Sequence, residues 1–514
     1  MSSHPQRILI LDCGSQYTQL IARRVREARV YCEVEPWSLP LHKIKAFDPV
    51  GIILSGGPQS VYAEGAPRPD AGLLKMGVPV LGICYGMQWM AWALEGKVAR
   101  SENREYGPAH FTGAESCALF KGMPASQPIW MSHGDRVEGL PEGFVVSGST
   151  PSAPVAAFMA PSRGLFAIQF HPEVTHTVQG REVLRRFLYE ICGAKGDWTM
   201  DSFVASATAG IRAQVGQERV LCAISGGVDS SVMALLIHRA IGEKLDLLFI
   251  DHGLLRKDES RLVQESFAEK FHLKLRAVDA SEEFFAALRG LSDPEDKRKA
   301  VGRAFIEVFE REAKTLGDVR FLAQGTIYPD RIESAATSGA AQVIKSHHNV
   351  GGLPERMKMQ VVEPLRDLFK DEVRAVGRLL GLDEAFVKRQ PFPGPGLAVR
   401  ILGEVRPGDV SVLQEADHIF LEEIRAAGLY DAIAQAFAVL LPVRSVGVMG
   451  DERTYDRVVA LRAVTTEDYM TADWYRFEPD FLARVSSRIV NEVRGVNRVV
   501  YDVTSKPPGT IEWE

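Results

Sequence analysis

The sequence has no excess of positive charge. Among its 514 residues, 60 Lys and Arg stand against 66 Asp and Glu, which gives a formal net charge of -6 at pH 7. Proteins that bind nucleic acid usually carry a strong basic excess, because they neutralise phosphate charges. We therefore expect no nucleic-acid partner for this chain.

Cysteine is also sparse, and its spacing fits neither a disulfide framework nor a zinc site. The six cysteines include no Cys-x-x-Cys pair, which predicts reduced thiols and a cytoplasmic location. They are Cys13, Cys32, Cys84, Cys117, Cys192 and Cys222.

Long apolar runs are missing too. The run Ile8–Leu11 near the N-terminus is too short for a signal peptide. No stretch approaches the roughly 18 uncharged apolar residues that a transmembrane helix needs, so we expect no membrane partner. The sequence also contains no internal repeat and no low-complexity tract.

What is present is the composition of an ordinary globular protein, with 46% hydrophobic and 25% charged residues. At about 150 residues per domain, the length suggests about three domains. Short apolar runs such as Arg7–Leu11 and Val78–Ile83 alternate with helical patterns over the first two-thirds of the chain. This repetition of strand, tight turn and helix predicts parallel sheets with helices on both faces.

Two breaks divide the chain. Residues 193–197 form a small polar stretch, and residues 390–396 hold prolines and glycines that would end any helix. The segment after the second break mixes strand and helix patterns. We therefore predict an α/β protein with two doubly wound parallel-sheet domains, at 7–196 and 197–389, followed by a smaller α+β domain at 390–514.

The first motif with chemical meaning is Gly82-Ile-Cys84-Tyr-Gly86, which follows a predicted strand and opens a predicted helix. This pattern is the thiol version of the nucleophile elbow, in which glycines permit a sharp turn. The helix N-terminus beneath Cys84 favours the thiolate. The structural alternative is a buried cysteine that packs as a small apolar residue. The elbow favours catalysis by Cys84.

A nucleophile of this kind needs a base and donors for the oxyanion. His171-Pro-Glu173 follows another predicted strand, so His171 can take the thiol proton while Glu173 orients its ring. The backbone N–H groups of Gly57 and Tyr85 can stabilise the oxyanion. Alone, each segment could be an ordinary turn. Together they predict a Cys84–His171–Glu173 triad.

These motifs resemble the class I glutamine amidotransferases over residues 7–192. The resemblance rests on Leu54–Pro58, Gly82–Gln88 and Gln169–Glu173. It implies hydrolysis of glutamine to glutamate through a thioester, with release of ammonia. It also implies that Gln88 and the segment Ser132–Asp135 shape the glutamine pocket.

A second loop, Ser225-Gly-Gly-Val-Asp-Ser230, follows a predicted strand and opens a helix. Small residues let backbone N–H groups approach phosphate oxygens, and the helix dipole adds attraction. The loop lacks the Gly-Lys-Ser/Thr of a Walker A sequence, so transfer of a γ-phosphate is not expected. The alternative is a plain glycine-rich turn. The candidate ATP contacts are Ser225, Gly226, Gly227, Val228, Asp229, Ser230 and Ser231, with Asp229 also suited to Mg²⁺.

This loop resembles the pyrophosphatase loop of the N-type ATP pyrophosphatases. The resemblance implies cleavage of ATP between its α- and β-phosphates and adenylylation of a substrate oxygen. Leu368–Arg374 also matches that family, which implies that Lys370 contacts the leaving pyrophosphate. Without the family, Lys370 would be read as a solvated helix charge.

The rest of the chain resembles the glutamine-hydrolysing GMP synthase family, which narrows the activity. The matching segments are Ile344–Leu353, Pro391–Leu397 and Lys506–Glu514. The resemblance implies that ATP adenylylates O2 of xanthosine monophosphate (XMP) and that ammonia displaces AMP. It further implies Mg²⁺ as the companion of ATP, a homodimer formed through the last domain, and a flexible lid over residues 339–352.

The same resemblance suggests residues for the XMP site. Lys506 can act as a point charge for the phosphate. Ile511 and Glu512 can hold the nucleotide from the end of the chain, and Arg298 matches a position that contacts it. Asp451 and Gln435 match less closely. Without the family, residues 297–299 would be read as a solvated charge run and the C-terminal tail as disordered, but the apolar Ile511 and Trp513 argue against a frayed tail.

Two other functions stay open from sequence alone. A non-catalytic protein could have kept these folds, but it should have lost Cys84, His171 or the second loop, and all are present. A different ATP pyrophosphatase acting on another substrate should lack the ending at Lys506-Pro-Pro. A class II amidotransferase would need cysteine after the initiator methionine, where this chain has Ser2.

Overall fold

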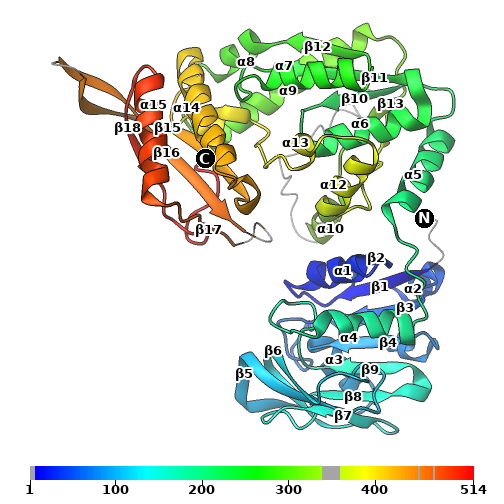
Figure 1. Ribbon diagram of the computed structural model, residues 1–514. Helices are drawn as coiled ribbons and strands as arrows, with labels where there is room; N and C mark the ends of the chain where they lie inside the picture. Colours follow the sequence, from blue (N-terminus) through cyan, green and yellow to red (C-terminus); the bar gives the residue numbers. More distant parts are fainter. Residues whose placement is uncertain (1–5, 338–358, 450–451, 467–468, 470) are drawn as a thin grey trace. The chain divides into compact units, whose positions relative to one another are not determined.

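A computed structural model describes residues 6–337, 359–449, 452–466, 469 and 471–514 (Figure 1). The chain forms two compact units. The first comprises Met1–Ser206 and Pro329–Ala341, and the second comprises Ala207–Tyr328 and Gln342–Glu514. The predicted lid at 339–352 and the candidate Asp451 lie outside the described residues. The predicted three-domain division stays a prediction.

The first unit is built on a nine-stranded sheet. Its parallel half has the order β2-β1-β3-β4-β9. The strands β1, β3, β4 and β9 are mostly apolar and buried, as expected for strands covered on both faces, whereas the edge strand β2 carries Glu33 and Glu35. The strands of this half are β1 (Arg7–Asp12), β2 (Tyr31–Pro36), β3 (Gly51–Leu54), β4 (Val80–Ile83) and β9 (Leu165–Ile168), with helices α1 (Thr18–Glu27), α2 (Leu41–Phe47), α3 (Tyr85–Ala93) and α4 (Gly180–Arg186).

The same sheet continues past β9 with antiparallel strands in the order β8-β7-β5-β6. The sheet is therefore mixed, with parallel pairing limited to the half that carries the nucleophile motif. The antiparallel strands are β5 (Lys97–Gly113), β6 (Ser126–Gly139), β7 (Val145–Ser149) and β8 (Ala157–Ala160).

The second unit begins with a five-stranded, all-parallel sheet in the order β12-β11-β10-β13-β14. It confirms the predicted parallel α/β architecture for this part of the chain. The strands are β10 (Val220–Ile224), β11 (Leu245–Asp251), β12 (Leu275–Asp279), β13 (Phe321–Ala323) and β14 (Gln360–Val362). The helices of this unit are α6 (Val228–Ile241), α7 (Glu259–Glu265), α8 (Ser281–Leu288), α9 (Pro294–Thr315), α12 (Lys370–Leu379) and α13 (Glu384–Val387). Helix α5 (Met200–Val215) begins in the first unit and ends in the second, and all of α10 (Tyr328–Thr337) except Tyr328 belongs to the first unit.

The C-terminal part of the second unit is α+β, as predicted. Strands β15 (Gln435–Met449) and β16 (Glu452–Thr465) pair antiparallel, and β17 (Asp473–Trp474) and β18 (Val496–Tyr501) both pair with β16. Helices α14 (Pro407–Ala426) and α15 (Pro479–Glu492) supply apolar residues to the core on one face of this sheet. On the other face, Ile511 packs with Phe437 and Ala460.

The end of the chain is tied to this second face by a buried cation. The fully buried Arg462 on β16 donates to the carbonyl oxygens of Thr504 and Thr510, and its guanidinium lies 3.2 Å from a carboxylate oxygen of Asp502. A buried guanidinium without acceptors would cost several kcal/mol, on the order of 3–5, so these contacts hold the tail in place. The tail is ordered, as Ile511 and Trp513 predicted.

Among the described helices, none is long and apolar enough to cross a membrane. All six cysteines are free in the structure.

Candidate active site

The nucleophile motif forms a sharp turn between β4 and α3. Cys84 is the residue before the helix and has φ 52° and ψ -105°, a conformation that L-residues rarely adopt. The flanking glycines are required by close packing. A Cβ at Gly86 would lie 2.5 Å from the carbonyl oxygen of Leu54, and one at Gly82 would lie 2.8 Å from the backbone of Gly86. The local sequence therefore fixes an elbow that holds Cys84 between sheet and helix.

His171 and Glu173 lie beside this elbow, just past the end of β9. His171 Nδ1 is 2.6 Å from Glu173 Oε1, and both side chains are buried. Burial alone would lower the pKa of His171, but the Glu173 carboxylate and the Cys84 sulfur outweigh it and raise this pKa to about 11. His171 is therefore an imidazolium at neutral pH, next to the sulfur of Cys84. The structure brings the three predicted triad residues together.

Thr177 also supports the histidine, and nothing in the sequence singled it out. Its hydroxyl donates to the carbonyl oxygen of His171 over 2.6 Å and accepts from the backbone N–H of Trp130. The ring of Tyr17 meets the His171 ring edge-on, with centroids 5.3 Å apart. These contacts fix where the imidazole sits.

The predicted oxyanion donors flank the elbow as expected. A Cβ at Gly56 would lie 3.1 Å from His171 Cε1 and 3.6 Å from Cys84 Cβ, so the turn after β3 lies against the triad. In the described part of the chain, no residue accepts a hydrogen bond from the N–H of Gly57 or Tyr85. Both groups are therefore available to a ligand oxygen.

Gln88 lies one turn into α3 and organises the neighbouring strand. Its side-chain amide donates to the carbonyl oxygen of Asp135 over 2.8 Å. On the same strand, His133 contacts Glu105 Oε2 and the Asp135 carbonyl oxygen, each at 3.0 Å. Burial lowers the pKa of His133, although Glu105 partly opposes this. The predicted pocket segment, including the Ser132 carbonyl oxygen 3.5 Å from Cys84 Sγ, thus lies at the triad.

In the second unit, the loop after β10 is closed by its own serines. Ser230 Oγ accepts from the Ser225 N–H at 3.2 Å and lies 3.1 Å from Ser225 Oγ. Ser231 Oγ donates to the Gly227 carbonyl oxygen, and α6 begins at Val228. The predicted residues therefore form one compact loop at a helix N-terminus, the geometry that binds phosphate groups.

Asp229 and Lys370 meet beside this loop. Lys370, the first residue of α12, forms an ion pair with Asp229 Oδ2. The other oxygen, Asp229 Oδ1, is buried, and no described residue hydrogen-bonds to it. A buried carboxylate oxygen of this kind is a fitting ligand for Mg²⁺, which binds one or two carboxylates together with phosphate oxygens. Within the described ranges, no group of three or more His, Cys, Asp or Glu residues is placed so that it could hold a metal ion.

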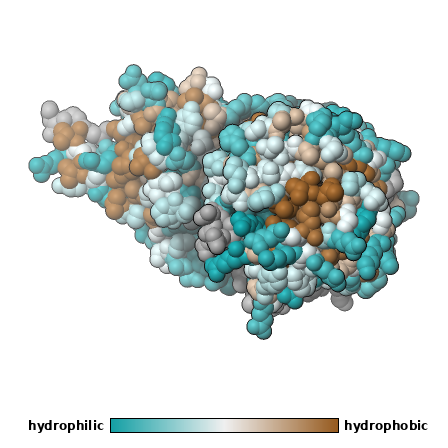
Figure 2. Space-filling model, turned by 90° about the horizontal axis from the view of Figure 1, so that it is seen from below, coloured by the Kyte–Doolittle hydropathy of each residue, from teal (hydrophilic) through white to brown (hydrophobic). Residues whose placement is uncertain are grey.

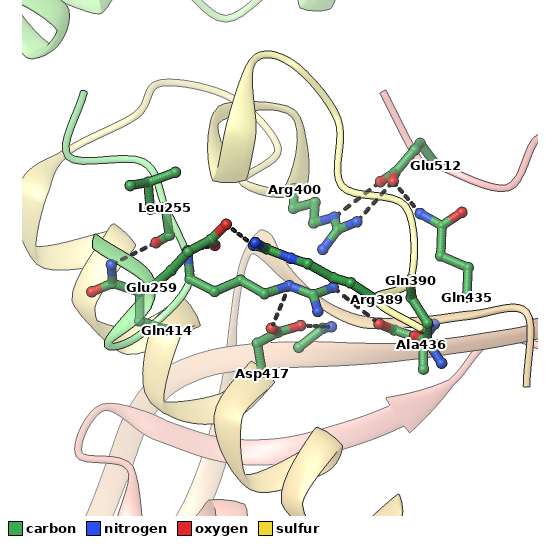
Figure 3. Close-up of polar contacts among 12 residues, drawn as sticks. Leu255, Glu259, Arg389, Gln390, Arg400, Gln414, Asp417, Gln435, Ala436 and Glu512 are labelled. Atoms are coloured by element: carbon green, nitrogen blue, oxygen red, sulfur yellow. Dashed lines mark hydrogen bonds and ion pairs between the residues drawn. The ribbon is translucent and has the colours of Figure 1, made fainter. Parts of the chain in front are cut away.

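The Glu512 carboxylate, near the C-terminus, is held by two side chains, Arg400 and Gln435 (Figure 3). Arg400 holds this carboxylate with two parallel hydrogen bonds of 2.8 and 3.0 Å, and Gln435 donates to the same carboxylate over 2.6 Å. Two of the predicted nucleotide contacts, Gln435 and Glu512, are thus in direct contact. Sequence reasoning missed Arg400, whose only signal is a lone charge in the apolar run Leu397–Ile401.

The other predicted nucleotide contacts lie along the same tail. Arg298 on α9 donates to the backbone carbonyl oxygen of Glu514, and Lys506 Nζ donates to the Tyr469 carbonyl oxygen over 2.7 Å. Lys297 is not solvated: it is fully buried and donates to three carbonyl oxygens near Gly403. No described contact joins Lys506 to Glu512.

Known protein families match both ends of the chain. Residues 9–191 match the family described as class I glutamine amidotransferase, and residues 422–513 match the GMP synthase C-terminal domain. The glutamine-hydrolysing GMP synthase of Carboxydothermus hydrogenoformans is 56% identical over 508 residues, covering 99% of each chain. The chain belongs to the glutamine-hydrolysing GMP synthase family.

A second GMP synthase, from Sinorhizobium fredii, is 57% identical over 517 residues, covering 100% of this chain and 99% of the relative. Among solved structures, a glutamine amidotransferase from Thermotoga maritima covers 37% of this chain and 100% of its own, with 19% identity and a TM-score of 0.32. The two family matches and the full-length relatives confirm the expected GMP synthase resemblance and fold class.

Replacing Glu173 by Gln is expected to lower the pKa of His171 well below its value of about 11, because the amide no longer stabilises the imidazolium while burial still opposes it. Protonation of His171 stabilises the folded state fully below about pH 6.5, and this contribution is lost as the pH rises towards 11. In the variant, the same contribution is lost at a lower pH. NMR titration of the His171 ring checks the prediction. Glu182→Gln, on an exposed part of α4, is the matched control, and an unchanged titration in Glu173→Gln would refute the assignment.

Proposed function

We propose that this member of the GMP synthase family converts XMP to GMP with glutamine as nitrogen donor. Glutamine hydrolysis supplies ammonia, ATP adenylylates O2 of XMP, and ammonia displaces AMP. The products are GMP, AMP, pyrophosphate and glutamate, so the enzyme is a ligase that forms a C–N bond. The observation that carries the proposal is the Cys84–His171–Glu173 cluster in a chain with full-length similarity to GMP synthases.

In the glutaminase half-reaction, the sulfur of Cys84 attacks the side-chain amide carbon of glutamine. The N–H groups of Gly57 and Tyr85 stabilise the negative charge on the carbonyl oxygen. His171 donates its proton to the leaving nitrogen, so ammonia departs and a thioester remains on Cys84. His171 then removes a proton from water, which attacks the thioester and releases glutamate. Glu173 keeps the imidazole oriented and stabilises its charged form.

In the synthetase half-reaction, the loop after β10 holds the phosphates of ATP. Its backbone N–H groups and the hydroxyls of Ser225, Ser230 and Ser231 are donors at a helix N-terminus. Lys370 neutralises the leaving pyrophosphate, and Asp229 would hold Mg²⁺. When bound, Mg²⁺ supplies positive charge against the phosphate oxygens. The Lys370–Asp229 ion pair supports this assignment, because ATP-Mg²⁺ would give each partner a new counter-charge.

We assign XMP to the C-terminal tail. Lys506 and Arg298 are the cations for its phosphate, while Glu512, Ile511 and Gln435 contact the nucleoside. Asp451 is a further candidate. Support comes from the anchoring of the tail by Arg400 and Arg462, which gives Glu512 a fixed position rather than a frayed end.

Cys84→Ala tests the two half-reactions separately. The wild type is expected to form GMP from XMP and ATP-Mg²⁺ with either glutamine or ammonium, followed by the absorbance change of the purine. The variant is expected to lose glutamine-dependent turnover by at least about a thousandfold, because its nucleophile is gone, and to keep the ammonium-dependent rate.

Cys117→Ala, at a buried cysteine away from the elbow motif, is the matched control and should keep both activities. If Cys84→Ala still uses glutamine, Cys84 is not the nucleophile. If the wild type forms no GMP from ammonium, XMP is not the substrate.

Asp229→Asn is expected to raise the Mg²⁺ concentration for half-maximal ammonium-dependent turnover by at least about tenfold, because the amide is a weaker ligand than the carboxylate. A Mg²⁺ titration at saturating ATP measures this, and excess EDTA should stop turnover in both proteins. Asp383→Asn at the exposed start of α13 serves as the control. If the Mg²⁺ titration curves of Asp229→Asn and wild type coincide, Asp229 is not a Mg²⁺ ligand.

We also propose that the chain forms a homodimer through its C-terminal part. The far end of the β15–β16 hairpin projects from the sheet (Figure 1). It exposes Val443, Val446, Val448 and Tyr455, with 73% of Val448 accessible. Brown residues at the left of Figure 2 lie on this part of the molecule. Clustered apolar side chains of this kind favour a protein interface.

Val448→Glu is expected to shift the wild-type dimer towards monomer, because a buried carboxylate at the interface would lose its hydration. Sedimentation velocity at micromolar concentration measures this. Val178→Glu, at an exposed valine of the first unit, should leave the dimer intact. A monomeric wild type, or a dimeric Val448→Glu, would count against the hairpin interface.

The free cysteines support a cytoplasmic location, because that compartment keeps thiols reduced. Recovery of the protein from a secreted or membrane fraction would contradict this location.

A further inference from the structure

The phosphate-binding loop is held from behind by an arginine that lies 163 residues further along the chain. Arg389 Nη1 donates to the carbonyl oxygen of Gly226 over 2.5 Å. Gly226 has φ +73°, and a Cβ there would lie 2.6 Å from Val263 Cγ2 and 3.2 Å from Arg389 Nη1. The loop is therefore wedged between α7 and the guanidinium, and only glycine fits at this position.

Arg389 is itself fixed by a buried carboxylate. Its Nη2 forms an ion pair with Glu259 at the start of α7, as Figure 3 shows. The second oxygen of Glu259 accepts the backbone N–H of Arg256 at 3.0 Å. The side chain of Arg256 in turn lies 3.3 Å from the carboxylate of Asp417 on α14. Arg256 therefore connects Glu259 to α14.

The bond from Arg389 to Gly226 determines where the next N–H group points. In a trans peptide, the carbonyl and the N–H point in opposite directions. Since Arg389 draws the Gly226 carbonyl oxygen towards the interior, the N–H of Gly227 faces away from Arg389, on the side of Ser225 Oγ at 3.3 Å. Without Arg389, this peptide could flip and present its carbonyl oxygen to phosphate, which would repel it.

Gln390, the next residue, is hydrogen-bonded to the C-terminal part of the second unit. Its side chain accepts the N–H of Ala436 at 2.8 Å and donates to the carbonyl oxygen of Ile433 at 3.0 Å (Figure 3 shows the contact with Ala436). Ala436 follows Gln435, which holds Glu512. The predicted domain boundary between residues 389 and 390 thus lies between two side chains that are hydrogen-bonded to different parts of the second unit.

We propose that Arg389 is a positioning residue that orients the Gly226–Gly227 peptide for ATP, and that Gln390 fixes Arg389 to the strand carrying Gln435. This inference rests on the proposed binding of ATP at the loop. Arginine suits the role because its planar fork reaches a carbonyl oxygen and a carboxylate at once, whereas a lysine ammonium is a single point.

Arg389→Ala tests this role in the ammonium-dependent reaction. The KM for ATP is expected to rise on the order of 10- to 100-fold, because a charge-assisted hydrogen bond is lost, while the KM for XMP stays within about twofold. Millimolar guanidinium chloride should restore part of the ATP affinity, whereas sodium chloride at equal ionic strength should not. Arg378→Ala, at an exposed arginine of α12, is the matched control.

Two further variants keep the inference testable if Arg389→Ala folds poorly. Arg389→Lys should show an intermediate KM for ATP. Gln390→Ala should raise the KM for ATP several-fold, about three- to tenfold, although Gln390 does not touch the loop in the structure. Thermal unfolding of each variant separates these effects from general destabilisation.

The inference is overturned if Arg389→Ala and Gln390→Ala leave the KM for ATP within about twofold of wild type. It is also overturned if the KM values for ATP and XMP rise together without rescue by guanidinium, since that pattern would reflect general loosening. A wild type that forms no GMP from ammonium would instead refute the proposed function.

Discussion

The second unit depends on one physical constraint: a guanidinium withdrawn from water must find acceptors, or the fold loses several kcal/mol. Arg400 and Arg462 are fully buried, and each donates to acceptors on a segment distant in sequence. Arg400 binds Glu512 and stacks over the ring of Phe437, 4.1 Å from its centroid. Since the acceptors come from the last residues of the chain, the buried cations determine where the tail can lie.

The first unit meets a different constraint, which is the close approach of backbone around the elbow. Gly82 and Gly86 leave no room for a Cβ, and between them Cys84 adopts a positive φ. Within this turn, electrostatics determine the protonation of His171. The Glu173 carboxylate raises the pKa of His171 against the effect of burial and keeps the ring protonated beside the Cys84 sulfur. Sterics thus position the nucleophile, and electrostatics set the protonation of its partner.

These two constraints differ in how far the sequence could reveal them. The elbow is local, so five consecutive residues predicted both its shape and its nucleophile, and the parallel strands were visible as short apolar runs. The long strand β5 was not predicted, because Gly107 and Pro108 interrupt its alternation. In β15, only the part after Pro442 was predicted as a strand. The partners of Arg389 and Arg400 could not be predicted either, because an isolated charge in a sequence does not say which distant carboxylate it will meet. The lone arginine between Val399 and Ile401 was the one hint of a buried ion pair.

The long-range contacts of Arg389 and Gln390 bear on the proposed adenylylation step. The α-phosphorus of ATP and O2 of XMP must come within reacting distance, and a well-oriented pair of bound reactants gains as much as about 7–11 kcal/mol over a freely diffusing one. A flexible linker at residues 389–390 would reduce this free-energy advantage, because the distance between the proposed ATP and XMP subsites would then vary. The observed junction instead consists of two hydrogen-bonded side chains: Arg389 binds Gly226 and Gln390 binds Ala436. The prolines and glycines of residues 390–396 suggested a domain break. The start of this segment is instead the part of the chain best placed to hold the two proposed nucleotide subsites at a fixed separation.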